Sequence, residues 1–96
     1  MKFEWDERKN YLNILKHGIS FENAKAVFAG FTVDILDDRF DYGETRKISI
    51  GTLAGVAILA VVHTDREGTC RIISARKANR KERKKYEEEI QSTFDT

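Results

Sequence analysis

The sequence predicts an α+β fold made of two N-terminal helices, a four-stranded antiparallel sheet and a C-terminal helix, with the helices on one face of the sheet. Apolar residues recur at helical spacing before Gly30, β-rich segments with short turns follow, and a highly charged helical segment comes last. Because the turns are short, consecutive strands are expected to be antiparallel. The chain has 96 residues, 41% apolar and 34% charged, and so suits one globular domain, residues 1–96.

The first helix follows a short extended segment, Phe3–Trp5. Asp6 can cap its start, and Gly18 can end it. Its predicted buried face consists of the apolar residues Tyr11, Leu12, Ile14 and Leu15.

The second helix is expected to begin at Ser20 and to stop at Gly30. Its apolar residues recur at helical spacing and are Phe21, Ala24, Val27 and Phe28. Because only a few residues separate the two helices, we expect an αα-hairpin.

Four segments in the middle of the chain have the composition of strands. They are Thr32–Leu36, Arg46–Ile50, Val56–Thr64 and Thr69–Arg76. The second alternates polar and apolar residues and should be half-buried, whereas the third is apolar on both faces and should be central. The connections are predicted to be a polar loop and two turns, at Asp37–Gly43, Gly51–Gly55 and Asp65–Gly68.

A four-residue turn at Asp65–Gly68 would place His63 opposite Cys70. Alternation would put both on one face of the sheet, together with Ile72 and Ser74. A histidine beside a cysteine resembles a base and its nucleophile, but no orienting group or oxyanion hole is visible in the sequence. Cys70 is therefore expected to be a small core residue.

The segment Arg71–Tyr86 concentrates the positive charge of the chain. It holds eight basic residues and one acidic residue, a local charge of +7 in a protein whose formal net charge is +1. The other residues together must therefore carry −6. Such segregation is typical of a surface that binds phosphates, and a solvated lysine-rich helix is the alternative interpretation.

Within this segment, Asn79 and Glu82 have the spacing of a capping box and predict a helix over Arg80–Ile90. The first turns of this helix are basic and its end is acidic, at Glu87–Glu89. The helix dipole disfavours that order by roughly 0.3–1 kcal/mol per exposed charge. We therefore expect the basic turns to serve a ligand.

Several classes of function are excluded or disfavoured by composition. A single cysteine excludes an internal disulfide and a multi-cysteine zinc site. The acids Asp37, Asp38 and Asp41 do not continue as a calcium-binding EF-hand, so a solvated turn is expected. No apolar run approaches the roughly 20 residues that cross a bilayer, and no signal peptide is visible. We expect a cytoplasmic protein without a bound metal or cofactor.

Three arginines, Arg46, Arg71 and Arg76, lie in or at the ends of predicted strands, where a guanidinium requires a partner. Each could pair with an acid such as Glu44 or an aspartate of the polar loop, or extend its charged end to the edge of the sheet; alternatively, all three could share an anionic ligand. Their common location beside the basic helix favours the shared ligand.

Two further residues have open roles. His17 lies at the end of the first helix, where a structural interaction with the helix dipole and a catalytic role are both consistent with the sequence. Tyr86 could pack its ring on the sheet or take part in catalysis.

The chain resembles the BrnT toxins of type II toxin–antitoxin modules. The matching segments are FEWDERKNYLNILKHGISFENAKAVF (Phe3–Phe28), GETRKISIG (Gly43–Gly51), VVHT (Val61–Thr64) and RIISARKANRKERKKYEE (Arg71–Glu88). They occur in the order of the family and cover nearly the whole chain. The combination of the opening segment with RIISAR and the terminal YE is specific.

The resemblance implies a RelE-like fold and ribonuclease activity that inhibits translation. Because RNA carries its own nucleophile, the 2′-OH, we expect such an enzyme to be a metal-independent endoribonuclease. It also implies a cognate, BrnA-like antitoxin that neutralises the toxin and through which DNA is contacted indirectly. The alternative is a non-catalytic nucleic-acid-binding or protein-interaction module with a basic surface.

The candidate residues of a ribonuclease follow from this scheme. Arg71 and Arg76 are predicted to bind the scissile phosphate, with Arg46 as a third candidate, because arginines grip phosphate oxygens bidentately. The predicted proton-transfer residues are His63 and Tyr86, and the predicted RNA-binding residues are His17, Arg80 and Lys81.

Overall fold

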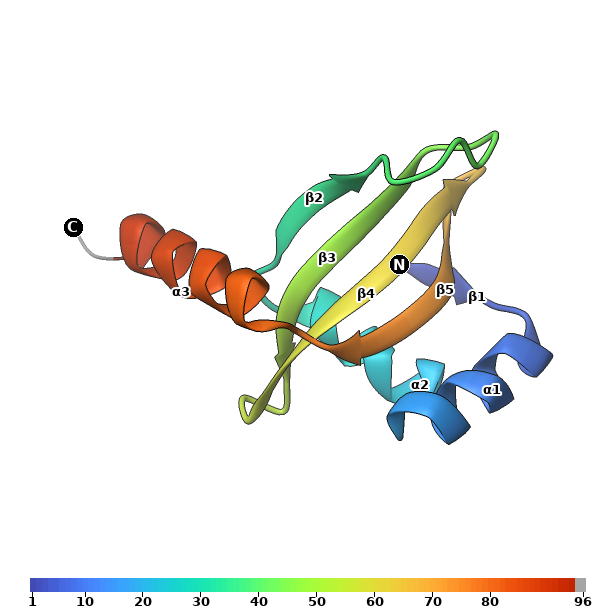
Figure 1. Ribbon diagram of the computed structural model, residues 1–96, viewed down its shortest axis with the longest axis horizontal. Coiled ribbons are helices and arrows are strands. Elements are labelled where there is room, and N and C mark those ends of the chain that lie inside the picture. Colours follow the sequence, from blue (N-terminus) through green and yellow to red (C-terminus); the bar gives the residue numbers. More distant parts are fainter. Residues whose placement is uncertain (95–96) are drawn as a thin grey trace.

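A computed structural model describes residues 1–94, which form one curved five-stranded sheet flanked by helices (Figure 1). The strands are β1 (Lys2–Glu4), β2 (Val33–Asp37), β3 (Arg46–Leu53), β4 (Ala57–Arg66) and β5 (Thr69–Lys77). The helices are α1 (Glu7–His17), α2 (Phe21–Ala24), the 3-10 helix η1 (Lys25–Ala29) and α3 (Arg80–Phe94). The α+β class is confirmed, and β4 is central in the strand order β1-β5-β4-β3-β2, as predicted.

The sheet has one strand more than predicted and is mixed rather than antiparallel. β1 runs parallel to β5, with Phe3 opposite Cys70 and Glu4 opposite Arg71. The other three pairings are antiparallel. The prediction missed β1 because three residues have no periodicity that could reveal a partner distant in sequence.

Each face of the sheet carries its own apolar cluster. The helical face, covered by α1, α2 and η1, buries a cluster that includes Phe21, Val27, Leu59, Val61 and Ile72. The opposite face buries Val33, Ile48, Ile50, Ala60 and Val62 together with Ala78 and Tyr86. The expectation that all helices share one face is wrong, because α3 packs against β2 and β3 from the side opposite η1.

α1 has the predicted ends but buries the face opposite to the predicted one. The Asp6 side chain accepts hydrogen bonds at the N-terminus, and Gly18 ends the helix in the left-handed conformation, at φ 72°. The predicted apolar face is exposed, by 61% at Tyr11, 52% at Leu12, 41% at Ile14 and 65% at Leu15. The buried residue of α1 is instead Asn13.

The orientation of α1 follows from the hydrogen bonds of Asn13. Its Nδ2 donates to the carbonyl oxygens of Ile19 and Ala75, both at 2.8 Å, and its Oδ1 accepts from the Ala75 N–H at 3.1 Å. β1 pairs with β5 only as far as Arg71, so the carboxamide of Asn13 replaces a neighbouring strand at Ala75. Buried backbone groups require such partners, and their satisfaction turns the polar side of α1 inward.

The second helix begins at the predicted cap and is shorter than an ordinary helix. Ser20 Oγ accepts a hydrogen bond from the Asn23 N–H at 3.0 Å. One α-helical turn continues as η1, which stops before Gly30. The Asn10 side chain of α1 accepts from the Phe21 N–H at 2.8 Å and so fixes the corner between the two helices.

The prediction that Gly51 begins a turn is wrong. Gly51 lies inside β3, which continues to Leu53. A Cβ atom at Gly51 would lie 2.8 Å from Cγ1 of Val27. The glycine therefore permits the close approach of η1 to β3.

The turn between β4 and β5 is shorter than predicted, because β4 continues to Arg66. Glu67 and Gly68 form a two-residue turn with φ values of 53° and 85°. Asp65, not His63, lies opposite Cys70, and His63 lies opposite Ile72.

The register of this hairpin also changes between Val62 and His63. Ser74 pairs with Val62 and therefore shares its face, away from Ile72 and Cys70. The grouping of His63, Cys70 and Ile72 on one face is nevertheless correct. The observed pairing differs from the predicted one by two residues, and a shift of two residues leaves every side chain on the same face.

α3 begins with the predicted capping box. The Glu82 N–H donates to Asn79 Oδ1 at 2.8 Å, and the Asn79 N–H donates to Glu82 Oε1 at 2.9 Å. The helix extends past the predicted end at Ile90 to Phe94. It projects away from the sheet beyond β2 (Figure 1).

Candidate functional site

The three strand arginines project from the same face of the sheet. Arg71 lies between Cys70 and Ile72, and Arg76 follows Ala75; these three neighbours belong to the cluster of the helical face. Arg46 alternates with Lys47 and shares the face of Ile48. Because side chains alternate along a strand, all three arginines point away from the helical face, onto what we call the arginine face.

The arginines occupy two places on this face. Arg71 lies opposite Thr64, and Arg46 is the residue next to the Lys47–His63 pair, so Arg46 and Arg71 flank Thr64 from either side. Arg76 lies five residues further along β5, which corresponds to about 16 Å of strand. The structure therefore places Arg46 and Arg71 at the same level of the sheet, on the two strands that flank β4, and Arg76 at the α3 end of β5.

Each of these arginines has a carboxylate partner. Arg71 Nη1 lies 2.6 Å from Glu4, and Arg46 Nε lies 3.0 Å from Glu44. Pairing with acids was one of the alternatives open from the sequence. The ion pairs hold the guanidinium groups in place while leaving the side chains of Arg71 and Arg46 25% and 22% exposed.

The pairs differ in how many donors they leave free. Arg71 and Arg46 each use one nitrogen, whereas Arg76 directs both terminal nitrogens at Glu82, at 2.7 and 3.0 Å. The Arg46 guanidinium also lies 3.9 Å from the centroid of the Tyr42 ring. Arg46 and Arg71 thus keep most of their N–H groups available, while Arg76 braces the start of α3.

The electrostatics favour the ionised forms of Glu82 and Glu44. Burial acts to raise the pKa of Glu82, but hydrogen bonds from Arg76 and the Asn79 N–H outweigh it and lower the pKa. The same Glu82 pair raises the pKa of Arg76. At the other end, the hydrogen bond from Arg46 lowers the pKa of Glu44.

Sequence reasoning missed one element of this face. Asp37 was expected in a solvated turn but is 5% exposed at the end of β2, where it binds Arg39 through two hydrogen bonds of 2.8 and 3.0 Å and Tyr42 through one of 3.3 Å. The hydrogen bonds from Arg39 lower the pKa of Asp37. The only signal in the sequence was an arginine and a tyrosine just after an aspartate that follows an apolar strand.

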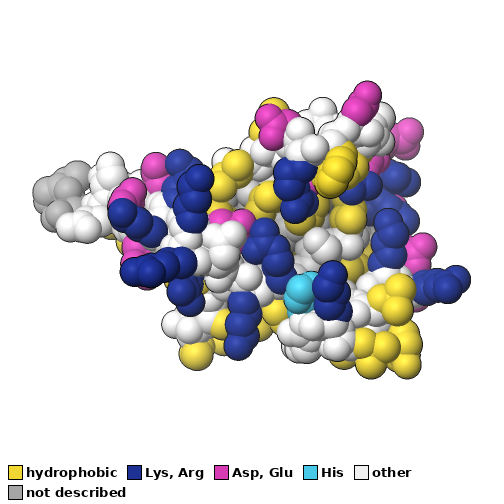
Figure 2. Space-filling model, viewed as in Figure 1, with side chains coloured by type: hydrophobic (Ala, Val, Ile, Leu, Met, Phe, Trp, Pro, Cys, Tyr) yellow, Lys and Arg dark blue, Asp and Glu magenta, His cyan; other side chains and the backbone are white. Residues whose placement is uncertain are grey.

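α3 continues the positive surface beyond the sheet. Its exposed basic residues are Arg80, Lys81, Arg83, Lys84 and Lys85. Figure 2 shows the basic side chains of α3 and of the adjoining sheet on one side of the molecule. Tyr86 is 5% exposed, and its ring packs against Phe31 at a centroid distance of 5.9 Å, so the ring has the structural role that the sequence left open.

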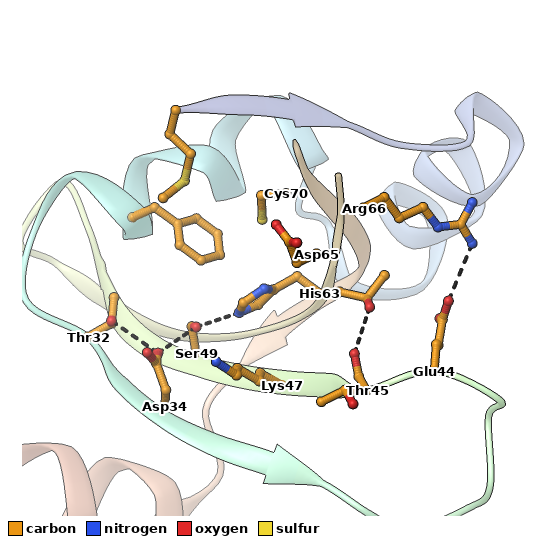
Figure 3. Close-up of a pocket in the computed structure, with 13 residues that line it drawn as sticks. Thr32, Asp34, Glu44, Thr45, Lys47, Ser49, His63, Asp65, Arg66 and Cys70 are labelled. Atoms are coloured by element: carbon orange, nitrogen blue, oxygen red, sulfur yellow. Dashed lines mark hydrogen bonds and ion pairs between the residues drawn. The ribbon is translucent and has the colours of Figure 1, made fainter. Parts of the chain in front are cut away.

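His63 lies on the helical face, apart from the arginines, in a cleft of about 760 Å³ (Figure 3). Its Nε2 is 2.6 Å from Ser49 Oγ, which donates to Asp34 at 2.6 Å; Thr32 donates to the same carboxylate oxygen at 3.1 Å. Because the Ser49 proton is directed at Asp34, His63 Nε2 is the donor to Ser49. Burial lowers the pKa of His63, although the charge of Asp34 opposes the shift.

Two further residues considered in the sequence are His17 and Cys70. His17 is half-buried in the last turn of α1, on the side of the helix that carries Asn13. Cys70 lines the cleft beside His63, and burial raises the pKa of its thiol to about 11. A neutral thiol is a poor nucleophile, which agrees with its expected role as a small core residue.

The arginine face can bind phosphate groups through preorganised guanidinium donors. No group of three or more His, Cys, Asp or Glu side chains in residues 1–94 is arranged to hold a metal ion. In the same part of the chain, no helix is long and apolar enough to span a membrane.

Comparisons with known proteins give the family. A family model described as the ribonuclease toxin BrnT of type II toxin–antitoxin systems matches residues 5–82. The crystal structure of the ribonuclease toxin BrnT from Brucella abortus is 29% identical, with a TM-score of 0.64, over 83% of this chain and 99% of that one. No curated protein sequence matches the chain. The fold, the basic face and these similarities lead to one conclusion: the chain belongs to the BrnT family of ribonuclease toxins of type II toxin–antitoxin systems.

Proposed function

We propose that this protein is a metal-independent endoribonuclease that cleaves RNA on the arginine face and thereby inhibits translation. The observation that carries the proposal is the pairing of Arg46 and Arg71 on either side of Thr64, each with free N–H donors. Two forks so placed can bind the non-bridging oxygens of one phosphate. Arg76, Arg80 and Lys81 then bind phosphates further along the strand, at the α3 end.

In this mechanism the RNA supplies its own nucleophile. The 2′-oxygen attacks the adjacent phosphorus while the bond from phosphorus to the 5′-oxygen breaks, and the 2′-hydroxyl proton leaves as the 5′-oxygen gains one. The products are a 2′,3′-cyclic phosphate and a 5′-hydroxyl. Arg46 and Arg71 contribute by holding the phosphate in line and by stabilising the charge that develops on its oxygens.

Glu4 and Glu44 support this role as positioning residues. Each fixes its arginine with one charge-assisted hydrogen bond, so the donors need little reorganisation when RNA binds. His63 lies in the cleft on the helical face, so the proposal assigns it no proton transfer at the arginine face, and His17 stays a candidate RNA-binding residue. Tyr86→Phe tests whether its hydroxyl contributes: a loss of cleavage without a loss of stability would give the hydroxyl a part in proton transfer.

The test is incubation of the purified chain, free of any partner, with 5′-labelled RNA in EDTA. Arg46→Ala and Arg71→Ala should each slow cleavage by about a hundredfold or more, because each removes a donor to the reacting phosphate. Arg8→Ala is the matched control, since Arg8 is an exposed arginine of α1, and it should cleave as the wild type does. Thermal unfolding of every variant checks the fold.

Four results would contradict the proposal. Products with 5′-phosphate ends would indicate a different reaction, and loss of wild-type cleavage in EDTA would indicate a metal requirement. Full activity of the Arg46→Ala/Arg71→Ala double variant would remove the phosphate site from this place. Intact RNA that is still bound would favour the alternative of a non-catalytic binding module.

The proposal extends to the partners of the toxin. A cognate, BrnA-like antitoxin binds and neutralises the toxin, and contact with DNA occurs only through that antitoxin. Co-expression of the antitoxin should restore growth of cells that produce the toxin, and failure to restore growth would contradict this part of the proposal.

A further inference from the structure

The outer face of α1 is an apolar surface without a partner in the described residues. Tyr11, Leu12 and Leu15 are each more than half exposed, and Ile14 beside them is 41% exposed. They occur on one short helix whose opposite side, with Asn10 and Asn13, binds backbone groups. The helix is therefore amphipathic, but it packs on the sheet with its polar side.

Exposure of this apolar face to water is unfavourable unless a partner covers the face. Exposed single leucines are common, whereas contiguous apolar patches mark interaction sites. At 100° per residue, Tyr11, Leu12 and Leu15 lie within one sector of the helix, together with Arg8. Together with Ile14 beside Tyr11, these side chains form such a patch within about one and a half turns of α1.

The charges around the patch indicate the sign of the partner. Arg8, Lys9 and Lys16 are exposed, and none of them forms a salt bridge within residues 1–94. The acid on this helix, Glu7, already accepts a hydrogen bond from the Trp5 indole at 2.6 Å. The patch is therefore bordered by free positive charge, which favours an acidic partner.

A second copy of this chain fits the patch less well. In an antiparallel pair of α1 helices centred on Leu12, Arg8 of one copy would lie near Lys16 of the other. Like charges would then meet at both ends of the contact, which disfavours the symmetric dimer.

We propose that the outer face of α1 is the docking surface for an acidic amphipathic helix of the cognate antitoxin. The inference depends on the proposed function for the existence of that partner, and it adds the place and the chemistry of the contact. Apolar side chains of the antitoxin helix would pack on Tyr11, Leu12 and Leu15, and carboxylates would pair with Arg8 and Lys16. α1 thus anchors the antitoxin on the helical side of the sheet, away from Arg46 and Arg71.

The test separates anchoring from activity. Leu12→Ser/Leu15→Ser removes the apolar centre, and its affinity for the purified cognate antitoxin should fall by about a hundredfold or more, measured by isothermal titration calorimetry. RNA cleavage by the free variant should match that of the wild type. Val56→Ser is the control, because Val56 is 90% exposed at the β3–β4 turn, and it should bind the antitoxin normally.

A second variant tests the charges. Arg8→Glu/Lys16→Glu should weaken antitoxin binding, and added salt should no longer weaken it further, because the attraction is replaced by a repulsion that salt screens. In cells, both double variants should remain toxic when the antitoxin is co-expressed.

Four outcomes would overturn the inference. Antitoxin affinity of Leu12→Ser/Leu15→Ser within threefold of the wild type would place the contact elsewhere. Self-association of the wild type that this variant abolishes would make the patch a dimer contact. Binding to phosphatidylserine vesicles that the variant abolishes would make it a membrane contact. A variant that unfolds would show that the leucines are structural. If the wild type binds antitoxin but does not cleave RNA, the proposed enzyme fails while the docking surface stands.

Discussion

Replacement of Asn13 by leucine should destabilise the protein strongly, although it puts an apolar residue at a buried position. The substitution removes two hydrogen bonds of 2.8 Å and one of 3.1 Å and leaves the Ala75 N–H, the Ala75 carbonyl and the Ile19 carbonyl without partners. An unsatisfied buried polar group costs about 1–3 kcal/mol, so three such groups predict a loss of roughly 3–5 kcal/mol once partial solvation is allowed for. Small domains are stable by about 5–15 kcal/mol, so this loss is large.

The matched control is Leu12→Ser on the same helix. Leu12 is 52% exposed, and its replacement should change the free energy of unfolding by less than about 0.5 kcal/mol. Urea denaturation at 25 °C, followed by circular dichroism, measures both variants. A loss below about 1 kcal/mol for Asn13→Leu, or a larger loss for Leu12→Ser than for Asn13→Leu, would refute the orientation of α1.

Three further predictions concern buried groups on the helical face. Burial lowers the pKa of His63, so the contribution of neutral His63 to stability is complete above the unfolded pKa of about 6.5 and is lost as the pH falls through the folded pKa. His63→Gln should therefore flatten the dependence of the urea midpoint on pH between 5 and 7. An unchanged dependence would contradict this. Cys70, with a pKa raised to about 11, should react with a thiol reagent at pH 8 far more slowly in the native protein than in urea, and equal rates would show that it is accessible. Gly51→Ala should cost about 1–3 kcal/mol in thermal or urea unfolding, because its Cβ would lie 2.8 Å from Val27; a stability equal to the wild type would mean that η1 can move aside.

The arginine pairs bear on how mutations at the proposed site should be interpreted. Arg76 binds Glu82, whose side chain is only 11% exposed, so its loss strands a buried carboxylate as well as removing a positive charge. Arg71 binds Glu4, whose side chain is 40% exposed, and its loss leaves a carboxylate that water can reach. A defect of Arg71→Ala is therefore the clearer measure of phosphate binding, whereas Arg76→Ala also reports on the start of α3.

The local features of this fold were predictable because their interactions span only a few residues. Asp6, Ser20 and the Asn79–Glu82 pair cap helices through bonds to backbone groups two or three positions away. The density of arginine and lysine after Arg71 is likewise a property of the sequence itself, and so is the resemblance to the BrnT family. These features determined the helix starts, the α+β class and the family.

The tertiary structure decided which sides of the elements face one another. β1 pairs with β5 and Asn13 binds Ala75 because backbone groups far apart in the sequence must be satisfied at the edge of the sheet, and no local pattern encodes that need. The same requirement turned the apolar side of α1 outward. The two-residue turn, the register change beside His63 and the alternation of side chains then separated His63 from the arginines. Candidate site residues can be identified from the sequence, but the pairing of distant strands determines which of them lie close together.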